Sequence, residues 1–136
     1  MDVSEAVEFL RHHHRGVLAT TRSDGRPQLS PVTAGGDARG RVIVSSRETA
    51  IKVKNLRRVP YASYAGFTDA FFGDWVQVEG SVEVVALPEA MDLLVSYYRD
   101  IAGEHPDWDD YRAAMVRDQR VIIAITPERV GPNVGG

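Results

Sequence analysis

Cysteine is absent from this 136-residue chain. The absence excludes disulfides, thiolate metal sites and a cysteine nucleophile. Long apolar runs are absent as well, so the sequence predicts no membrane-spanning helix, no secretory leader and no membrane partner. We therefore expect a cytoplasmic protein.

A strong excess of charge is also missing. The formal net charge is only −3, which argues against a protein that coats nucleic acid. The cations are nevertheless concentrated in one short segment, opposed there only by Glu48: Arg47, Lys52, Lys54, Arg57 and Arg58. A local basic site on an acidic protein suits a small anionic ligand better than a long polyanion.

Length and composition, with 43% hydrophobic and 26% charged residues, predict one compact domain over residues 1–136. Helices are expected at 3–13, at 48–58, from Pro88 onward and after an N-cap at Asp107. In the first of these, Val3, Val7 and Leu10 form the apolar side. Alternation and turn signals predict short strands, which are 16–22, 28–34, 41–46, 61–66, 75–85 and 121–126.

One glycine and one proline refine this pattern. Gly80 interrupts a strand and predicts a bulge, and Pro127 is expected to end the last strand. Short strands joined by tight turns, with helices between them, favour an antiparallel barrel, which is a mainly β (α+β) fold.

The junction between the third strand and the second helix carries the strongest functional signal. Ser45 and Glu48 have capping-box spacing, and we expect Ser45 to cap the helix. Hydroxyls, cations and free helix N–H groups would then meet at one helix start, which is a natural anion site. A phosphate of a nucleotide-like cofactor is the expected ligand.

Four segments together resemble a known family. They are 16–32 (GVLATTRSDGRPQLSPV), 45–56, 75–80 (WVQVEG) and 103–108 (GEHPDW). They are similar to the pyridoxamine 5′-phosphate oxidase-like superfamily of flavin-binding split β-barrels, and in particular to the actinobacterial branch that uses the deazaflavin coenzyme F420 instead of FMN. The resemblance implies an antiparallel, Greek-key split barrel with inserted and flanking helices.

The resemblance also implies roles for individual residues. Lys52 matches the basic residue that grips the cofactor phosphate, and the residues expected to complete that region are Ser46, Arg47, Thr49 and Asn55. The strand residues expected to run past the cofactor ring are Gln28, Ser30, Pro31 and Val32. Members of the fold are usually homodimers with cofactor sites at the interface, so Trp75 and Gln77 are candidate contacts from the partner subunit.

The implied function is transfer of hydride from reduced F420 to an unsaturated, small organic substrate. Two alternatives stay open: an FMN-dependent oxidase or reductase, and a non-enzymatic protein that binds a cofactor or haem. Pyridoxamine-phosphate oxidation itself is not expected, because Trp108 is the last tryptophan and no C-terminal tryptophan–arginine motif follows. Extra cations at Lys54, Arg57 and Arg58 favour F420, whose tail carries more anionic groups than FMN.

Each residue also has a purely structural interpretation. Lys52 and Arg47 suit solvated helix charges, Gln28 and Ser30 suit outward strand positions, and Trp75 suits a core or dimer contact. No catalytic acid can be named. The three consecutive histidines at 12–14 do not predict a metal site, because neighbouring helical residues fan out by about 100°. The substrate pocket is expected around loop 67–74, with the C-terminal tail as a further contributor.

Overall fold

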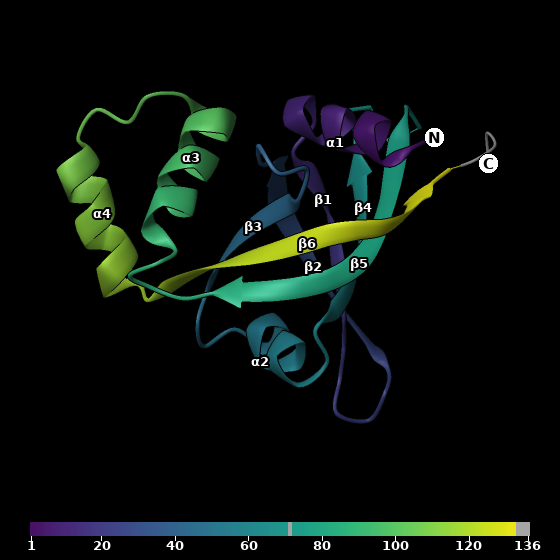
Figure 1. Cartoon of the computed structure of the whole chain (residues 1–136), viewed down its shortest axis with the longest axis horizontal. Coiled ribbons are helices and arrows are strands. Elements are labelled where there is room, and N and C mark those ends of the chain that lie inside the picture. Colours follow the sequence, from purple (N-terminus) through teal and green to yellow (C-terminus); the bar gives the residue numbers. More distant parts are fainter. Residues whose placement is uncertain (71, 133–136) are drawn as a thin grey trace.

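The computed structural model describes residues 1–70 and 72–132. Six strands form a closed antiparallel barrel in the order β1-β2-β3-β6-β5-β4, and helices cover its outside (Figure 1). The strands are β1 (Arg15–Thr21), β2 (Pro27–Gly36), β3 (Val42–Arg47), β4 (Tyr61–Phe67), β5 (Trp75–Val85) and β6 (Arg120–Gly131). The helices are α1 (Val3–His12), α2 (Ile51–Arg58), α3 (Met91–Ala102) and α4 (Trp108–Arg117). The predicted antiparallel barrel with flanking helices is confirmed.

The barrel is split between β2 and β3. β2 pairs with β1 along residues 27–33, but it pairs with β3 only through Ala34, Gly35 and Gly36. β3 instead continues along β6 until Arg47 lies opposite Arg120. Residues 27–33 of β2 therefore have one strand neighbour and leave an open edge at the split.

The long strands β5 and β6 cross the barrel around one irregularity. The register shifts between Glu79 and Gly80, so the predicted bulge at Gly80 is confirmed. Pro127 lies opposite Gly80 and does not end β6, which continues to Gly131. The predicted end at Thr126 was wrong because the bulge accommodates a residue that has no N–H for the ladder.

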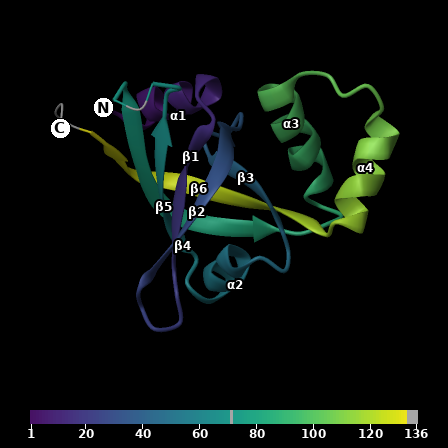
Figure 2. The same cartoon turned by 180° about the vertical axis from the view of Figure 1, so that it is seen from behind.

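Two apolar clusters hold the fold together. One fills the barrel interior, and α1 and α2 cover its two ends with Ala6, Leu10, Val53 and Leu56 (Figure 1). The other lies outside the barrel, where the α3–α4 hairpin packs on the outward side chains of β3 and β6 (Figure 2). The Tyr111 hydroxyl ties this hairpin together by donating to the Leu94 carbonyl at 2.7 Å.

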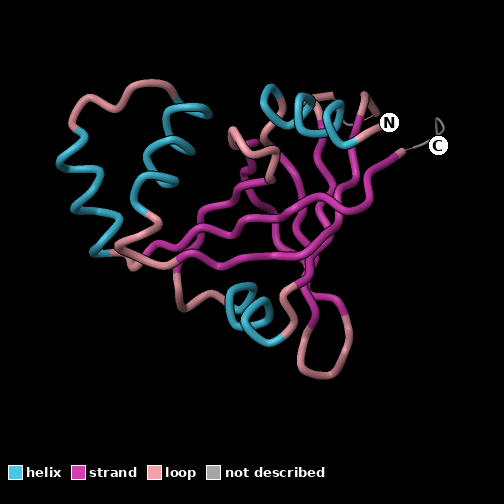
Figure 3. Tube along the Cα trace, in the orientation of Figure 1, coloured by secondary structure: helices cyan, strands magenta, loops and turns pink. Residues whose placement is uncertain are grey.

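Helix boundaries differ from the prediction at several points (Figure 3). α1 ends at His12 and Gly16 lies within β1, whereas Val3 on the predicted apolar side is 40% exposed and Ala6 is buried in its place. α3 begins at Met91, after a turn that contains Pro88. The Asp107 N-cap of α4 is confirmed, since its side chain accepts from the Asp110 N–H.

The start of α2 is the most consequential difference. The Glu48 N–H donates to the Gln119 carbonyl at 2.9 Å, so the backbone there extends the β3–β6 pairing instead of starting a helix. The N-cap is Ala50, which forms no side-chain hydrogen bond. The predicted cap by Ser45 was therefore wrong, because Ser45 is still a strand residue.

Candidate functional site

Three cations lie where β3 ends and β6 begins, beside α2. Arg47 and Arg120 are cross-strand partners, and Lys52 lies in the first turn of α2. Burial lowers the pKa of Lys52, and the Arg120 charge lowers it further. Within residues 1–70 and 72–132, no carboxylate forms an ion pair with any of the three. Like charges at this spacing destabilise the site, so the arrangement is suited to an anion.

The neighbouring hydroxyls contribute less than the sequence predicted. Ser46 is buried, and its hydroxyl donates to the Arg47 carbonyl at 3.1 Å. Thr49 is exposed in the turn before α2. The first amides of α2 have no capping side chain at Ala50, and the leading N–H groups of a helix have no intrahelical acceptor. The helix start thus adds donors to the three-cation group.

The open edge of β2 presents two alternating rows of side chains. Gln28, Ser30 and Val32 are half-buried, whereas Leu29 and Pro31 are exposed. The four β2 residues predicted to line a cofactor ring therefore do not share one side, because Pro31 points away from the other three. Gln28, Ser30 and Val32 form what we call the β2 track.

A chain of hydrogen bonds joins α2 to the β2 track. The Asn55 amide donates to the Thr20 hydroxyl at 3.0 Å, which donates to the Gln28 side-chain oxygen at 2.9 Å. Gln28 in turn donates to the Ser30 hydroxyl at 2.7 Å. Asn55 is 5% exposed, so it supports the β2 track from the protein interior and does not lie among the exposed cations. Thr20 was not predicted, although a threonine at an inward position of β1 was a visible signal.

Tyr97 of α3 contacts the two strands that border the split. Its hydroxyl donates to the Thr33 carbonyl of β2 at 2.8 Å. Burial raises the pKa of Tyr97, while the Ser45 backbone and the Arg120 charge lower it in part. Tyr97 thus links α3 to both strands that border the split. No sequence pattern indicated Tyr97 or Arg120, because their role depends on contacts between distant segments.

Other predicted residues lie apart from this group. Trp75 and Gln77 pair with β4 on β5, which β1 and β4 separate from β2. A role from the partner subunit stays a prediction. Arg57 forms an ion pair with Glu48 at 2.7 Å, and Arg58 donates to the Thr21 carbonyl and to Asn55.

Metal and membrane features are absent from the described part of the chain. No group of three His, Cys, Asp or Glu side chains there is placed to hold a metal ion. The His14 Nδ1 contacts the Ala34 carbonyl, and His12 contacts Glu8. Residues 1–70 and 72–132 contain no helix of the length and hydropathy required to cross a bilayer.

Comparison with known proteins gives one family. The family model described as pyridoxamine 5′-phosphate oxidase matches residues 3–133. A conserved hypothetical protein from Mycobacterium tuberculosis has 26% identity and a TM-score of 0.77, with 100% of this chain and 93% of that one covered.

Two further structures share the fold at lower identity. An F420 reductase has 21% identity and a TM-score of 0.70, covering 91% of this chain and 94% of its own. A heme-binding protein from Mycobacterium smegmatis has 20% identity and a TM-score of 0.66, covering 94% of this chain but 51% of its own. The family match spans nearly the whole sequence, and the split barrel agrees with it: this chain belongs to the pyridoxamine 5′-phosphate oxidase family, which includes flavin-type oxidoreductases.

Proposed function

We propose that the chain is an F420-dependent oxidoreductase that transfers hydride between the reduced deazaflavin and an unsaturated organic substrate. The observation that carries the proposal is the three-cation group of Arg47, Lys52 and Arg120 beside the open edge of β2. These cations fit a phosphate, and the β2 track next to them fits a planar ring. The F420 reductase among the structural neighbours supports the same cofactor.

The protein's own residues would position the cofactor. Lys52, Arg47 and Arg120 would pair with the phosphate, with Ser46 and Thr49 beside them. The Asn55–Thr20–Gln28 hydrogen bonds would hold the β2 track at a fixed distance from that phosphate. When bound, the deazaflavin supplies the hydride chemistry, and the protein supplies position, exclusion of water and charge.

A homodimer is part of the proposal. Leu29 and Ile51 are 63% and 56% exposed, and both lie beside the split. Large exposed apolar side chains at a functional edge are typical of a surface that a partner covers. In the proposed dimer, Trp75 and Gln77 of one subunit approach the cofactor held by the other.

FMN is the second candidate cofactor, and one observation favours it. Arg57 and Arg58 already have partners within the chain, so only Lys54 remains of the extra cations that favoured a longer anionic tail. The three-cation group alone matches a single terminal phosphate. FMN in place of F420 would make the protein an FMN-dependent oxidase or reductase of the same fold.

Titration of the purified protein with F420 and with FMN, followed by fluorescence quenching, tests the proposal. We expect saturable binding of F420 that weakens by roughly tenfold or more in Lys52→Gln, because a charge-assisted contact is lost. Arg112→Gln, at an exposed position of α4 outside the proposed site, is the control and should bind like the wild type. Tighter binding of FMN than of F420 would select the second candidate. No binding of either, or equal loss in both variants, would refute the phosphate site.

A further inference from the structure

A groove separates the β2–β3 hairpin from α3. One cavity of about 370 Å³ lies between Gly35–Arg41 and α3, where Leu93, Tyr97 and Asp100 line it. A second cavity of about 290 Å³ adjoins it and extends toward α1. The two share hairpin residues 35–38 and Asp100, so we treat them as one site, the hairpin groove. Its size suits a small organic ligand.

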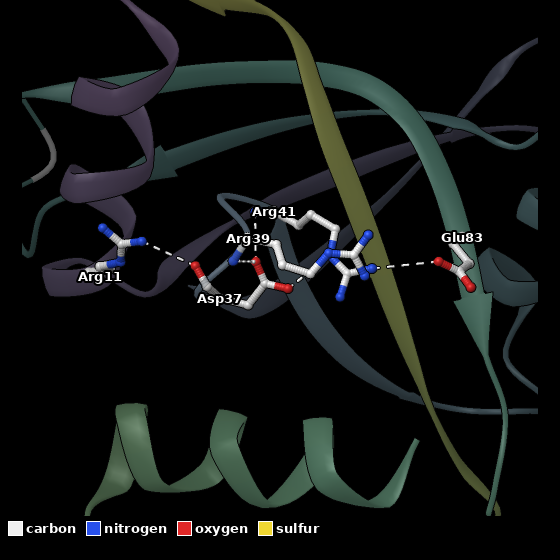
Figure 4. A network of polar contacts seen from close by, with 5 residues as sticks. All are labelled: Arg11, Asp37, Arg39, Arg41 and Glu83. Carbon is white, nitrogen blue, oxygen red and sulfur yellow. Dashed lines mark hydrogen bonds and ion pairs between the residues drawn. The ribbon is translucent and has the colours of Figure 1, made fainter. Parts of the chain in front are cut away.

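The hairpin groove has a rigid wall. The Asp37 carboxylate accepts from the Arg39 N–H at 3.0 Å, from the Arg41 N–H at 2.8 Å and from the Arg41 Nε at 2.8 Å. Arg11 of α1 donates to the Asp37 carbonyl at 3.1 Å, and Arg41 also contacts Glu83 at 3.5 Å. Figure 4 shows Asp37 between Arg11 and Arg41, with α3 running past the hairpin. These contacts hold the turn in one conformation, so a ligand would meet a preformed surface.

The groove offers an anion one unpaired cation. Four arginines and two aspartates line the two cavities, and Glu8, Glu83 and Glu104 outside the lining pair with three of these arginines. Arg41 pairs with Asp37, Arg99 pairs with Glu104 at 2.6 Å, and Arg11 pairs with Glu8 at 3.2 Å. Across the described residues, no carboxylate pairs with Arg39, which is exposed and lines the groove. Arg39 is therefore the cation available to a ligand.

The opposite part of the larger cavity is apolar. Ile43 is 3% exposed and Leu93 is half-buried, and the ring of Tyr97 lies beside them. Tyr97 also connects this cavity to the split, because its hydroxyl donates to the Thr33 carbonyl. Thr33 directly follows Val32 at the end of the β2 track. The groove thus adjoins the proposed position of the cofactor ring.

We infer that the hairpin groove is the substrate site and that the substrate is an organic carboxylate with an unsaturated, apolar body. Arg39 pairs with the carboxylate, Ile43 and Leu93 contact the body, and Tyr97 forms the wall toward the cofactor. The substrate role rests on the proposed cofactor position. The binding chemistry of the groove rests only on its own residues.

Calorimetric titration of the cofactor-free protein with cinnamate, and with cinnamyl alcohol as its uncharged counterpart, tests the inference. Cinnamate should bind and the alcohol should bind roughly tenfold more weakly or not at all. Arg39→Gln should weaken cinnamate binding to a similar extent, whereas Arg26→Gln, an exposed arginine in the β1–β2 turn, should leave it unchanged. Asp100→Asn should tighten it several-fold, because a like charge leaves the groove.

A second variant removes the space without changing the charge. Ser96→Trp places a large side chain at an exposed position of α3 that lines the cavity, and it should abolish cinnamate binding while far-ultraviolet circular dichroism stays native. Equal binding of acid and alcohol, or no effect of either Arg39→Gln or Ser96→Trp, would overturn the inference.

Titration of cinnamate into protein saturated with F420 separates this inference from the proposed function. Simultaneous binding supports a substrate site beside the cofactor. Displacement of cinnamate by F420 would assign the groove to the carboxylates of the cofactor tail and overturn the substrate role. No binding of cinnamate to the cofactor-free protein, with F420 binding intact, would reject the groove alone. Failure of F420 with intact cinnamate binding would reject the proposed function and leave a carboxylate site.

Discussion

Lys52 occupies an environment that opposes its own charge. It is half-buried at a helix start, where the dipole is positive, and the Arg120 charge acts on it as well. A residue held this way lowers the stability of the free protein and strengthens binding of an anion. Stability and binding should therefore respond in opposite directions to its removal.

Replacement of the charge tests this opposition. We expect Lys52→Met to raise the free energy of unfolding of the free protein by about 0.5 kcal/mol, because a cation leaves a helix N-terminus. The same variant should lose F420 binding. Urea denaturation and fluorescence titration measure the two effects, and Lys54→Met, at an exposed position of the same helix, should change both less. A destabilised Lys52→Met protein would contradict the account.

The pH dependence of binding follows from the same residue. The folded-state pKa of Lys52 is lowered from its ordinary value of 10.5. Between the lowered pKa and 10.5, the unfolded chain therefore binds more protons than the folded chain. The free protein gains stability as the pH rises through this window. Anion binding needs the charge and should weaken over the same window. Lys52→Arg stays charged there, so its affinity for F420 should remain flat where that of the wild type falls.

Asn55 supports the site through hydrogen bonds and not through charge. Removing its amide leaves the buried Thr20 hydroxyl without one of its partners, which costs about 1–3 kcal/mol. We expect Asn55→Ala to be destabilised by that amount in urea denaturation. Thr20→Val should be destabilised as well, and the double variant should lose less than the sum of the two. Strict additivity would show that the two side chains act independently.

Among the elements, strands were more predictable than helix starts. The alternation in β5 and the Asp24–Gly25 turn each depend on a few neighbouring residues. β5, and the strands β1 and β2 on either side of the turn, form as expected. The start of α2 depends on a hydrogen bond from Glu48 to Gln119, which no local pattern encodes. The same limit applies to the site. Lys52 and Gln28 were predictable from family phrases, but Arg120, Thr20 and Tyr97 join them only after the barrel closes.

The crossing of β5 and β6 depends on one glycine. A Cβ at Gly80 would lie 1.8 Å from the Thr126 carbonyl oxygen, which is backbone and cannot move aside. We expect Gly80→Ala to lose about 2 kcal/mol or more of stability, because two paired strands must separate. Gly35→Ala is the control, since its Cβ would meet Ile101 at an ordinary 3.6 Å. Equal melting temperatures for the two variants would contradict this account.

At the scale of the whole molecule, we propose that a second copy of the chain completes the site. The open edge of β2 and the exposed Leu29 and Ile51 lie on one part of the surface, whereas Trp75 and Gln77 lie on β5. A second copy would bring these parts together and would exclude water from the cofactor. Assembly and cofactor binding should then depend on each other.

A charge introduced at the split tests this dependence. We expect Leu29→Glu to convert a dimer into a monomer, because burial of an unpaired carboxylate in an interface is costly. F420 affinity should fall together with dimerisation. Size-exclusion chromatography with light scattering measures the first effect. Val116→Glu, at a 60% exposed position of α4, should leave the dimer intact; dissociation in that variant alone would move the interface to the helical hairpin.

The insertion of α3 and α4 between two paired strands has a further consequence. β5 ends at Val85, opposite Ile122, and β6 begins two residues earlier at Arg120, opposite Arg47 of β3. Segment 86–119 therefore leaves and re-enters the barrel at neighbouring strand ends. The pairing of the barrel strands therefore does not depend on the length or sequence of that segment. The same segment supplies one wall of the hairpin groove. Ligand preference in such a protein can diversify by exchange of one modular segment, while Arg47, Lys52 and Arg120 stay unchanged.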